Sequence, residues 1–397
     1  MLFRSGIIGA RDRGARLFIG DIGVTERVKI LLVAGARPNF VKIAPLMRAL
    51  SVRGNHFDTK LVHTGQHYDT SMSESFFEEL GIPQPEFRLD VGSYSHAQQT
   101  ARIMMAFEAV CCEEKPQLVV VVGDVNSTVA CSLVAKKLQI DVAHVEAGLR
   151  SGDRRMPEEI NRIVTDSISD WFFVTEPSGV DNLKREGHQA KRIHLVGNVM
   201  IDNLFYQQRR LESSPPNEQV ETLRTELGQR YGVVTLHRPS NVDDESTVRS
   251  ILSGIGKVAE RVPLVFAVHP RTSAMLHRCG IEVPPQVHLT PPLPYMAFLS
   301  LWSRATLVIT DSGGLQEETT ALGIPCITVR ENTERPITLT EGTNVMVGRD
   351  PARIVEEAFR VLDGHGKVGR RPALWDGHAA ERIVEVLDDL PGVCRTS

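Results

Sequence analysis

The sequence predicts an α/β protein built from two doubly wound domains, each a mostly parallel sheet with helices on both faces. Three observations support this prediction. The chain has 397 residues, whereas a single hydrophobic core stops growing at about 250–300 residues. Short runs rich in β-branched residues recur, each followed by a polar turn and a helix-like stretch, as in βα units with buried parallel strands. This rhythm stops over the polar segment 207–230 and then restarts.

The two series of runs predict the strands. Those of the first series are Val28–Ala34, Leu118–Val122, Val142–Val145, Trp171–Val174 and Ile193–Val196. Those of the second series are Gly232–Leu236, Leu264–Val268, Val287–Leu289, Leu307–Thr310 and Cys326–Val329.

The strand series divide the chain into four parts. We expect a poorly ordered extension at 1–27, a first domain at 28–205, a second domain at 206–375, and a C-terminal helix and tail at 376–397 that packs back on the first domain. Ligands of open α/β sheets bind beyond the carboxyl ends of the strands. Polar residues directly after each run are therefore the candidates for function.

The composition argues against several classes of function. With 42% apolar residues, 24% charged residues and a formal net charge of -4, the chain lacks the basic surplus of nucleic-acid or membrane-surface binders. No apolar run approaches the ~20 residues of a transmembrane helix, and charged residues interrupt any N-terminal signal peptide. The 6 cysteines form no CxxC pair or metal-binding spacing. We expect a cytoplasmic protein that acts on a small molecule.

Three acidic residues follow the strands of the first series. Asp124 and Glu146 come directly after two neighbouring strands, and Glu158 begins the next helix, four residues before Arg162. Taken singly, Asp124 could cap a helix and Glu158 could form a surface ion pair. Consecutive βα connections, however, bring all three to one rim, where like charges separate into acid and base roles. Their convergence predicts catalysis.

Basic residues surround the same rim. Arg37 and Lys42 flank a predicted helix start after the first strand. They form either a solvated helix terminus or the lining of a site for an anionic ligand.

The second series adds a histidine and a charged loop. His237 and Arg238 directly follow a strand, and these side chains suit proton transfer and phosphate contact respectively. The loop 330–336, which contains Arg335, follows the last predicted strand. We expect it to face the other domain, although a solvated loop remains an alternative for Glu331 and Glu334.

A serine and two glycines, Ser312, Gly313 and Gly314, stand between a strand and a helix. Backbone N–H groups there can hold a diphosphate, because glycine allows close approach and the helix dipole favours an anion. Glu318 lies one turn into the helix, where it could accept both hydroxyls of a ribose. Glu317 fits better as a residue that complements the helix dipole.

Neither a GxGxxG dinucleotide fingerprint, nor a Walker loop, nor a metal-ligand cluster occurs in the sequence. We therefore expect no cofactor and no metal.

Nine blocks of the sequence are long and specific. They are GARPNFVKIAPL at 35–46, TGQHYD at 64–69, VGDVNST at 122–128, HVEAGLRSGD at 144–153, PEEINR at 157–162, GN at 197–198, HR at 237–238, DSGGLQEE at 311–318 and TERP at 333–336. In this order, over about residues 28–380, the chain resembles the non-hydrolysing UDP-N-acetylglucosamine 2-epimerase family.

The resemblance implies a GT-B-like fold of two Rossmann-like domains facing across a cleft, with UDP held mainly by the second domain. It also implies an isomerase without a cofactor, usually a homodimer, that serves polysaccharide biosynthesis. Such enzymes convert UDP-N-acetylglucosamine, or a close UDP-N-acyl-hexosamine, to the C2 epimer UDP-N-acetylmannosamine. They eliminate UDP to a 2-acetamidoglucal and add it back, which suits a C2 that has no neighbouring carbonyl to acidify its proton.

By matching positions, the resemblance assigns roles to individual residues. Asp124, Glu146 and Glu158 form the acid, base and cation-stabilising set, with the division of roles open, and His237 meets the departing diphosphate. The substrate-binding residues are Arg37, Lys42, Gln66, Arg162, Ser312, Gly313, Gly314, Glu318 and Arg335.

The sequence departs from the common family pattern at Asn39, at Val125-Asn126 and at Pro239-Ser240-Asn241. These departures leave open the exact N-acyl hexosamine and any activation by substrate. Three other functions compete: a GT-B glycosyltransferase, a hydrolysing 2-epimerase, and a catalytically silent nucleotide-sugar sensor. A glycosyltransferase leaves the three carboxylates of the first domain underexplained.

Overall fold

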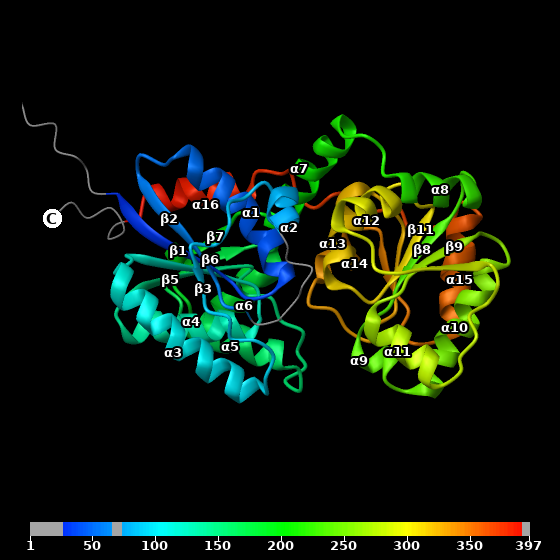
Figure 1. Ribbon diagram of the computed structural model, residues 1–397, viewed down its shortest axis with the longest axis horizontal. Helices are drawn as coiled ribbons and strands as arrows, with labels where there is room; N and C mark the ends of the chain where they lie inside the picture. The colour runs from blue at the N-terminus through cyan, green and yellow to red at the C-terminus, as the bar shows by residue number, and fades with distance from the viewer. Residues whose placement is uncertain (1–26, 66–73, 391–397) are drawn as a thin grey trace, which may run out of the picture.

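The computed structural model describes residues 27–65 and 74–390, which contain two parallel β-sheets lying side by side (Figure 1). The first sheet has seven strands in the order β3-β2-β1-β4-β5-β6-β7. Their bounds are β1 Val28–Ala34, β2 Phe57–His63, β3 Phe87–Arg88, β4 Leu118–Val122, β5 Asp141–Val145, β6 Trp171–Val174 and β7 Ile193–Leu195.

The second sheet has six strands in the order β10-β9-β8-β11-β12-β13. Their bounds are β8 Gly232–Thr235, β9 Leu264–Ala267, β10 Val287–Thr290, β11 Leu307–Thr310, β12 Cys326–Thr328 and β13 Asn344–Met346. Each sheet starts at a central strand, β1 or β8, extends to one edge and then returns to extend to the other edge. Ligands of such sheets bind at the carboxyl ends of the strands, beside the point where the direction of extension reverses.

The predicted fold class is confirmed, and each predicted strand is present with ends that shift by one residue at most. The sequence analysis missed β2, β3 and β13. Strand β2 escaped notice because Asp58, Thr59 and Lys60 interrupt its apolar pattern, and these side chains are half-buried. Strands β3 and β13 lie at the edges of the two sheets and have only 2 and 3 residues. Runs this short show no hydrophobic periodicity.

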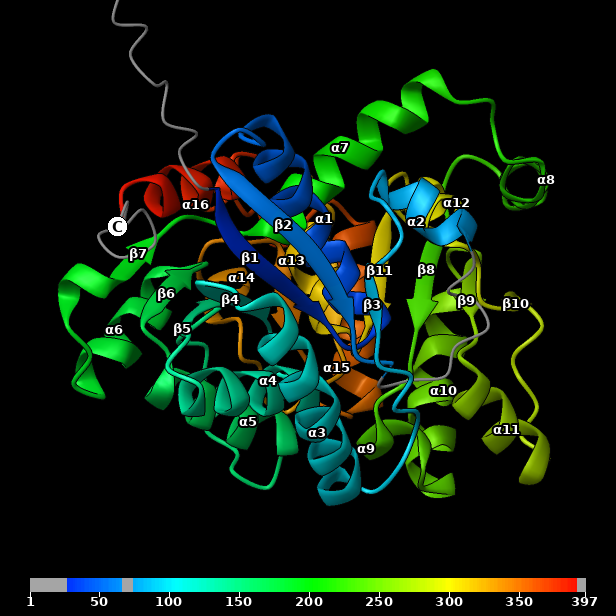
Figure 2. The same ribbon diagram turned by 60° about the vertical axis from the view of Figure 1, so that its left-hand side comes forward.

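Helices cover both faces of the first sheet (Figures 1 and 2). Helices α1, α7 and α16 pack on one face, and α3, α4 and α5 lie along the other. The bounds are α1 Arg37–Val52, α2 Glu74–Leu80, α3 His96–Glu114, α4 Asn126–Lys137, α5 Pro157–Ile168, α6 Pro177–Arg185, the 3₁₀ turn Ala190–Arg192, α7 Val199–Ser213 and α16 Ala379–Asp388.

The second sheet is covered in the same way. Helices α10 and α15 bury one face, and α12 and α13 bury the other together with side chains of α7. The bounds are α8 Glu218–Leu227, α9 Pro239–Val242, α10 Glu245–Ala259, α11 Pro270–Arg278, α12 Tyr295–Trp302, α13 Gly313–Leu322, α14 Pro336–Thr340 and α15 Pro351–Leu362. No helix within the two described ranges is long and apolar enough to cross a membrane.

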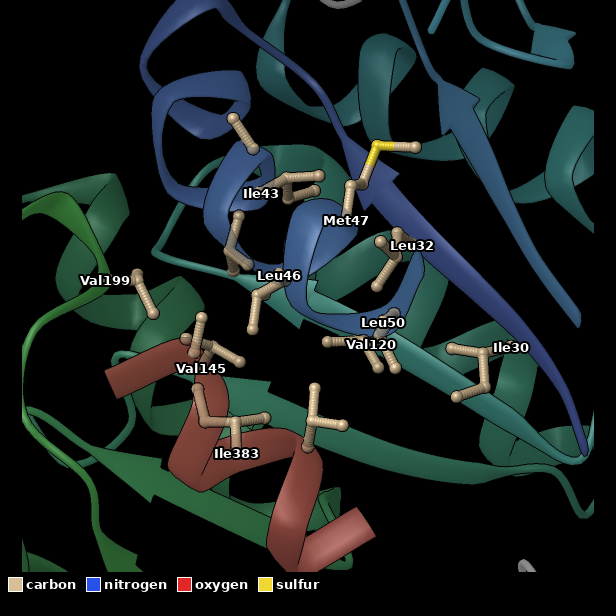
Figure 3. Packing of buried hydrophobic residues seen from close by; sticks show 14 of the residues in the cluster. Ile30, Leu32, Ile43, Leu46, Met47, Leu50, Val120, Val145, Val199 and Ile383 are labelled. Carbon is tan, nitrogen blue, oxygen red and sulfur yellow. The ribbon is translucent and has the colours of Figure 1, made fainter. Parts of the chain in front are cut away.

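The last helix returns to the first sheet. Ile383 of α16 is fully buried in the cluster formed by β1, β4 and α1, and Figure 3 shows it beside Val145 of β5. Asp202 of α7 accepts the N–H groups of Ala379 and Ala380 at the start of α16, at 3.1 and 2.7 Å. The chain therefore crosses between the sheets twice, once through α7 and once before α16. Residues 1–26 of the predicted N-terminal extension lie outside the described part.

Candidate active site

Glu146 lies where the two halves of the molecule meet. It follows β5 and is 6% exposed. Lys42 of α1 donates to its Oε2, and Nη2 of Arg335, from the second half, donates to its Oε1 at 2.9 Å. Burial by itself would raise the pKa of Glu146, but Lys42 and Arg335 outweigh it and hold the pKa below the ordinary value. Glu146 is therefore a buried carboxylate held ionised by two cations.

Asp124 is the second carboxylate of the site, after β4. An ideal Cβ on the preceding Gly123 would lie 3.6 Å from Oε2 of Glu146, so the two acidic loops touch. Arg162 of α5 donates to Asp124. Burial nevertheless raises the pKa of Asp124, against the opposing charges of Arg162 and Lys42. The pKa values of the two neighbouring carboxyls are thus shifted in opposite directions, which is the pattern expected of an acid and a base.

Glu159, rather than Glu158, anchors the helix that carries Arg162. Glu159 is 2% exposed, accepts the backbone N–H groups of Ser151 and Gly152 at 3.0 and 2.9 Å, and accepts Nη2 of Arg162 at 2.7 Å. Glu158 is half-buried and forms no hydrogen bond or ion pair with the described residues. The sequence analysis missed Glu159 because adjacent glutamates look alike in a pattern.

Two other predicted residues do not join this cluster. The guanidinium of Arg37 lies 5.0 Å from the ring centroid of Phe76. Gln66 lies outside the described residues. Of the cations predicted around the carboxylates, the structure brings together Lys42, Arg162 and Arg335.

In the second half, a buried aspartate organises His237. Asp311 follows β11, is fully buried, and lies 2.9 Å from Nδ1 of His237. It also accepts the backbone N–H groups of His237 and Arg238 and the side-chain amide of Asn241, at 2.9–3.1 Å. Because Nδ1 faces this carboxylate, it carries the proton, and Nε2 is the ring nitrogen left for a ligand. Asp311 is a positioning residue that the motif contained but the sequence analysis did not single out.

The serine-glycine turn begins α13 as predicted. Ser312 is the N-cap, and its hydroxyl accepts the N–H of Leu315 at 3.5 Å. An ideal Cβ on Gly313 would lie 3.1 Å from Cζ of Arg335, and one on Gly314 would lie 3.0 Å from Cε of Met200. Both positions thus exclude larger residues, and the first N–H groups of α13 lie beside the guanidinium of Arg335.

Glu318 lies in the first turns of α13 and is 6% exposed. Its Oε1 accepts the hydroxyl of Tyr295 at 3.1 Å. Burial raises the pKa of Glu318 to about 8, with the Tyr295 hydrogen bond opposing. A buried carboxyl with one phenol partner has capacity left for further donors.

Glu317 was interpreted as a residue that complements the helix dipole, and the structure corrects this. Its side chain is 1% exposed, forms an ion pair with Arg335 at 2.9 Å and accepts the amide of Asn198 at 3.0 Å. Burial raises its pKa to about 7, despite Arg335. The solvated alternative is likewise wrong for Glu334, which is 4% exposed and paired with Arg330 and Arg335, whereas Glu331 is exposed.

The described residues contain no group of three or more His, Cys, Asp and Glu side chains able to hold a metal ion. The chemistry that this arrangement supports is proton transfer by paired carboxyls beside a cationic site for an anion.

Comparison with known proteins decides the family. Residues 50–388 match the model of the UDP-N-acetylglucosamine 2-epimerase family. The UDP-N-acetylglucosamine 2-epimerase of Methanocaldococcus jannaschii is 39% identical over 368 residues, which cover 91% of this chain and 99% of that enzyme. The chain belongs to the UDP-N-acetylglucosamine 2-epimerase family. It is therefore an isomerase, and the predicted non-hydrolysing family is confirmed.

Other epimerases extend this result. A UDP-2,3-diacetamido-2,3-dideoxy-D-glucuronate 2-epimerase of Pseudomonas aeruginosa is 42% identical and covers 91% of the chain and 100% of the relative. The crystal structure of the Methanocaldococcus jannaschii epimerase in complex with UDP-GlcNAc and UDP superposes with a TM-score of 0.82 at 39% identity, covering 91% and 99% of the two chains. That of the Neisseria meningitidis epimerase bound to UDP-GlcNAc gives 0.83 at 28%, covering 91% and 100%. The GT-B-like fold is confirmed.

Proposed function

We propose that this epimerase interconverts UDP-N-acetylglucosamine and UDP-N-acetylmannosamine by elimination and re-addition of UDP. In the first step a base takes the C2 proton, the C1–O bond breaks, and UDP leaves with the electron pair to give a 2-acetamidoglucal. In the second step UDP returns to C1 and an acid delivers a proton to the opposite face of C2. Atoms balance without an oxidant, a metal or a cofactor.

The opposite pKa shifts of Asp124 and Glu146 are the observation that carries this proposal. Epimerisation needs one ionised and one protonated group at C2 at the same time. The pKa of Glu146 is lowered and the pKa of Asp124 is raised, which favours this combination. In the reaction direction that begins with Glu146 ionised, Glu146 takes the C2 proton as the base and Asp124 delivers a proton as the acid. Glu158, half-buried in the first turn of α5, supplies negative charge toward the oxocarbenium that develops at C1 in this proposal.

The second half holds UDP in this proposal. His237 meets the departing diphosphate through Nε2, while Asp311 keeps the imidazole ring in place. Ser312 and the N–H groups of Gly313 and Gly314 bind phosphate oxygens at the start of α13. Four basic residues line the sugar and the phosphates in this proposal, namely Arg37, Lys42, Arg162 and Arg335. Gln66 belongs to the same substrate-binding set.

The direct test is incubation of the purified protein with UDP-N-acetylglucosamine alone in D₂O, followed by NMR of the sugar. We expect deuterium at C2 and the appearance of UDP-N-acetylmannosamine. Stoichiometric release of free UDP with N-acetylmannosamine would instead indicate a hydrolysing epimerase. An unchanged sugar in the absence of an acceptor would indicate a glycosyltransferase or a binding protein, and either result would overturn the proposal.

A second candidate substrate is a UDP-2,3-diacetamido-2,3-dideoxy-D-glucuronate, since the Pseudomonas aeruginosa relative named for it is 42% identical to this chain. The ratio of kcat/KM for the two UDP-sugars separates the candidates. We expect the larger kcat/KM with UDP-N-acetylglucosamine, and the reverse order would assign the enzyme to the diacetamido uronate.

We also propose a cytoplasmic homodimer that supplies a precursor for polysaccharide biosynthesis. Each cysteine among the described residues is free, which agrees with a reducing compartment. Sedimentation equilibrium of the full chain tests the dimer, and a monomer mass at micromolar concentration would contradict it.

The affinity for UDP-sugars should rise with pH between 6 and 8. Burial raises the pKa of Glu318 to about 8, so this carboxyl is protonated below pH 8 in the free enzyme. Only the carboxylate accepts both ribose hydroxyls, and binding must therefore release the proton. For one titrating group we expect about tenfold weaker binding at pH 7 than at pH 9, measured by calorimetry with UDP-glucose, whose diphosphate keeps a constant charge over this range.

The matched control is Glu318→Gln, which cannot titrate. Its binding should be weak and nearly independent of pH. A pH dependence that persists in this variant would assign the effect to another group.

A further inference from the structure

A buried histidine lies between the two loops that carry the catalytic carboxyls. His144 of β5 is 0% exposed. Its Nδ1 lies 2.6 Å from Oδ1 of Asp166, and its Nε2 lies 2.8 Å from the backbone oxygen of Gly123. Since a strand residue with both ring nitrogens engaged has no capacity left for a ligand, His144 does not touch the substrate.

Both partners of the ring are acceptors. A backbone carbonyl cannot donate, and a neutral imidazole has only one N–H, so only the imidazolium satisfies Gly123 and an ionised Asp166 together. Asp166 is ionised: burial by itself would raise its pKa, but His144 and Arg150 hold the pKa below the ordinary value. Nη2 of Arg150 lies 2.7 Å from Oδ2 of Asp166 and also pairs with Glu186. The buried His144–Asp166 pair thus belongs to a network of four charged groups, together with Arg150 and Glu186.

Each end of this pair holds one acidic loop. Nε2 of His144 fixes the carbonyl of Gly123, which has a φ of 67° and directly precedes Asp124. Oδ2 of Asp166 accepts the N–H of Gly148, at 3.1 Å, two residues after Glu146. A single ion pair therefore spans the loop of the acid and the loop of the base.

The link between the two loops helps to hold the backbone conformation of Glu146. Its φ is 72°, in the left-handed region that is strained for a non-glycine residue. Such a conformation persists only where the surroundings over-determine it. The N–H of Glu146 donates to Phe173 O at 3.0 Å on one side, and the Asp166 contact to Gly148 holds the loop on the other.

Helix α5 connects the same network to the substrate side. Asp166 lies four residues after Arg162, one turn along α5, and Arg162 binds Asp124 directly. A shift of α5 that weakened the His144–Asp166 pair would also move the guanidinium beside the acid. The network thus couples Asp124, Glu146 and Arg162 through one face of α5.

We propose that the buried His144–Asp166 ion pair is a positioning device that sets the distance and direction between Asp124 and Glu146 for proton transfer at C2. This inference deepens the proposed epimerase function and rests on it. Neither residue reaches the UDP site, which the second sheet provides. Loss of the pair therefore acts on kcat and leaves nucleotide affinity unchanged.

The test compares His144→Gln and Asp166→Asn with His194→Gln, a histidine of β7 in the same sheet with no hydrogen bond to either acidic loop. Misplacement of reacting groups by about 1 Å costs about 10²-fold in rate. We expect kcat of C2 exchange to fall about 10²-fold in both network variants, with KM and the Kd of UDP changed by less than about twofold, and no change in His194→Gln. Unaltered kcat, or equal losses in kcat and UDP affinity, would overturn the positioning role.

A second measurement reads the protonation of the ring directly. Nitrogen NMR of the wild-type protein labelled with ¹⁵N-histidine is expected to show one buried ring with both nitrogens protonated, assigned by its loss in His144→Gln. A neutral ring at this position would overturn the proposal. The readouts also distinguish two failures: absence of C2 exchange in the wild type would refute the epimerase function, whereas the protonation of the ring tests the ion pair independently.

Discussion

Replacing Glu146 by glutamine is expected to lower the rate of C2 deuterium exchange by about 10³-fold, within the range of general acid–base catalysis. Glutamine keeps the size of the side chain but cannot take a proton. It also leaves Lys42 and Arg335 without the carboxylate that both now contact. Single-turnover exchange in D₂O, followed by NMR, measures the effect.

The matched control for this experiment is Glu212→Gln at an exposed position of α7, where exchange should stay at the wild-type rate. UDP binding should persist in Glu146→Gln, since the proposed nucleotide site is built on the second sheet. Exchange within tenfold of the wild-type rate would remove Glu146 from the catalytic set. Asp124→Asn, tested in parallel, is expected to behave in the same way.

Replacing Gly148 by alanine is expected to lower the free energy of unfolding by about 2–5 kcal/mol, from left-handed backbone strain and overpacking together. Gly148 has a φ of 80°, and an ideal Cβ would lie 2.8 Å from the carbonyl carbon of Gly179 and nearer still to its oxygen. Both contacts are backbone, so no side chain can rotate away. Chemical denaturation measures the loss.

Gly187→Ala separates strain from steric overlap. Gly187 has a φ of 92°, with nothing within 4 Å of an ideal Cβ, so alanine there carries the backbone strain alone. We expect a loss of about 1–2 kcal/mol. Equal losses at Gly148 and Gly187 would show that the close approach of Gly179 contributes nothing.

Much of the site follows from one rule that the sequence reveals. Asp124, Glu146 and His237 each come directly after a predicted strand, and parallel strands deliver their carboxyl ends to one edge. Local pattern therefore suffices to place Asp124 and Glu146 near one another, and His237 at the corresponding edge of the second sheet. The pairing of Glu146 with Arg335 could not be predicted in this way, because the two residues are 189 positions apart and belong to different sheets.

The residues that sequence reasoning missed share a different property. His144, Asp166, Asp311 and Glu317 are buried polar groups whose partners come from other elements. His144 lies inside an apolar strand, where it resembles a core residue, and its partner is 22 residues away on α5. Such groups are recognised only through the acceptors and donors around them.

The sequence by itself determined the two doubly wound domains, the positions of most strands along the chain and the family, because these depend on periodicity and on contiguous motifs. Only the tertiary structure decided how the members of each glutamate pair are placed: Glu159 rather than Glu158 holds Arg162, whereas Glu317 and Glu318 are both buried. Neighbouring helical residues point about 100° apart. The rotation of a helix, set by how its whole surface packs, therefore decides which of two identical side chains meets the site.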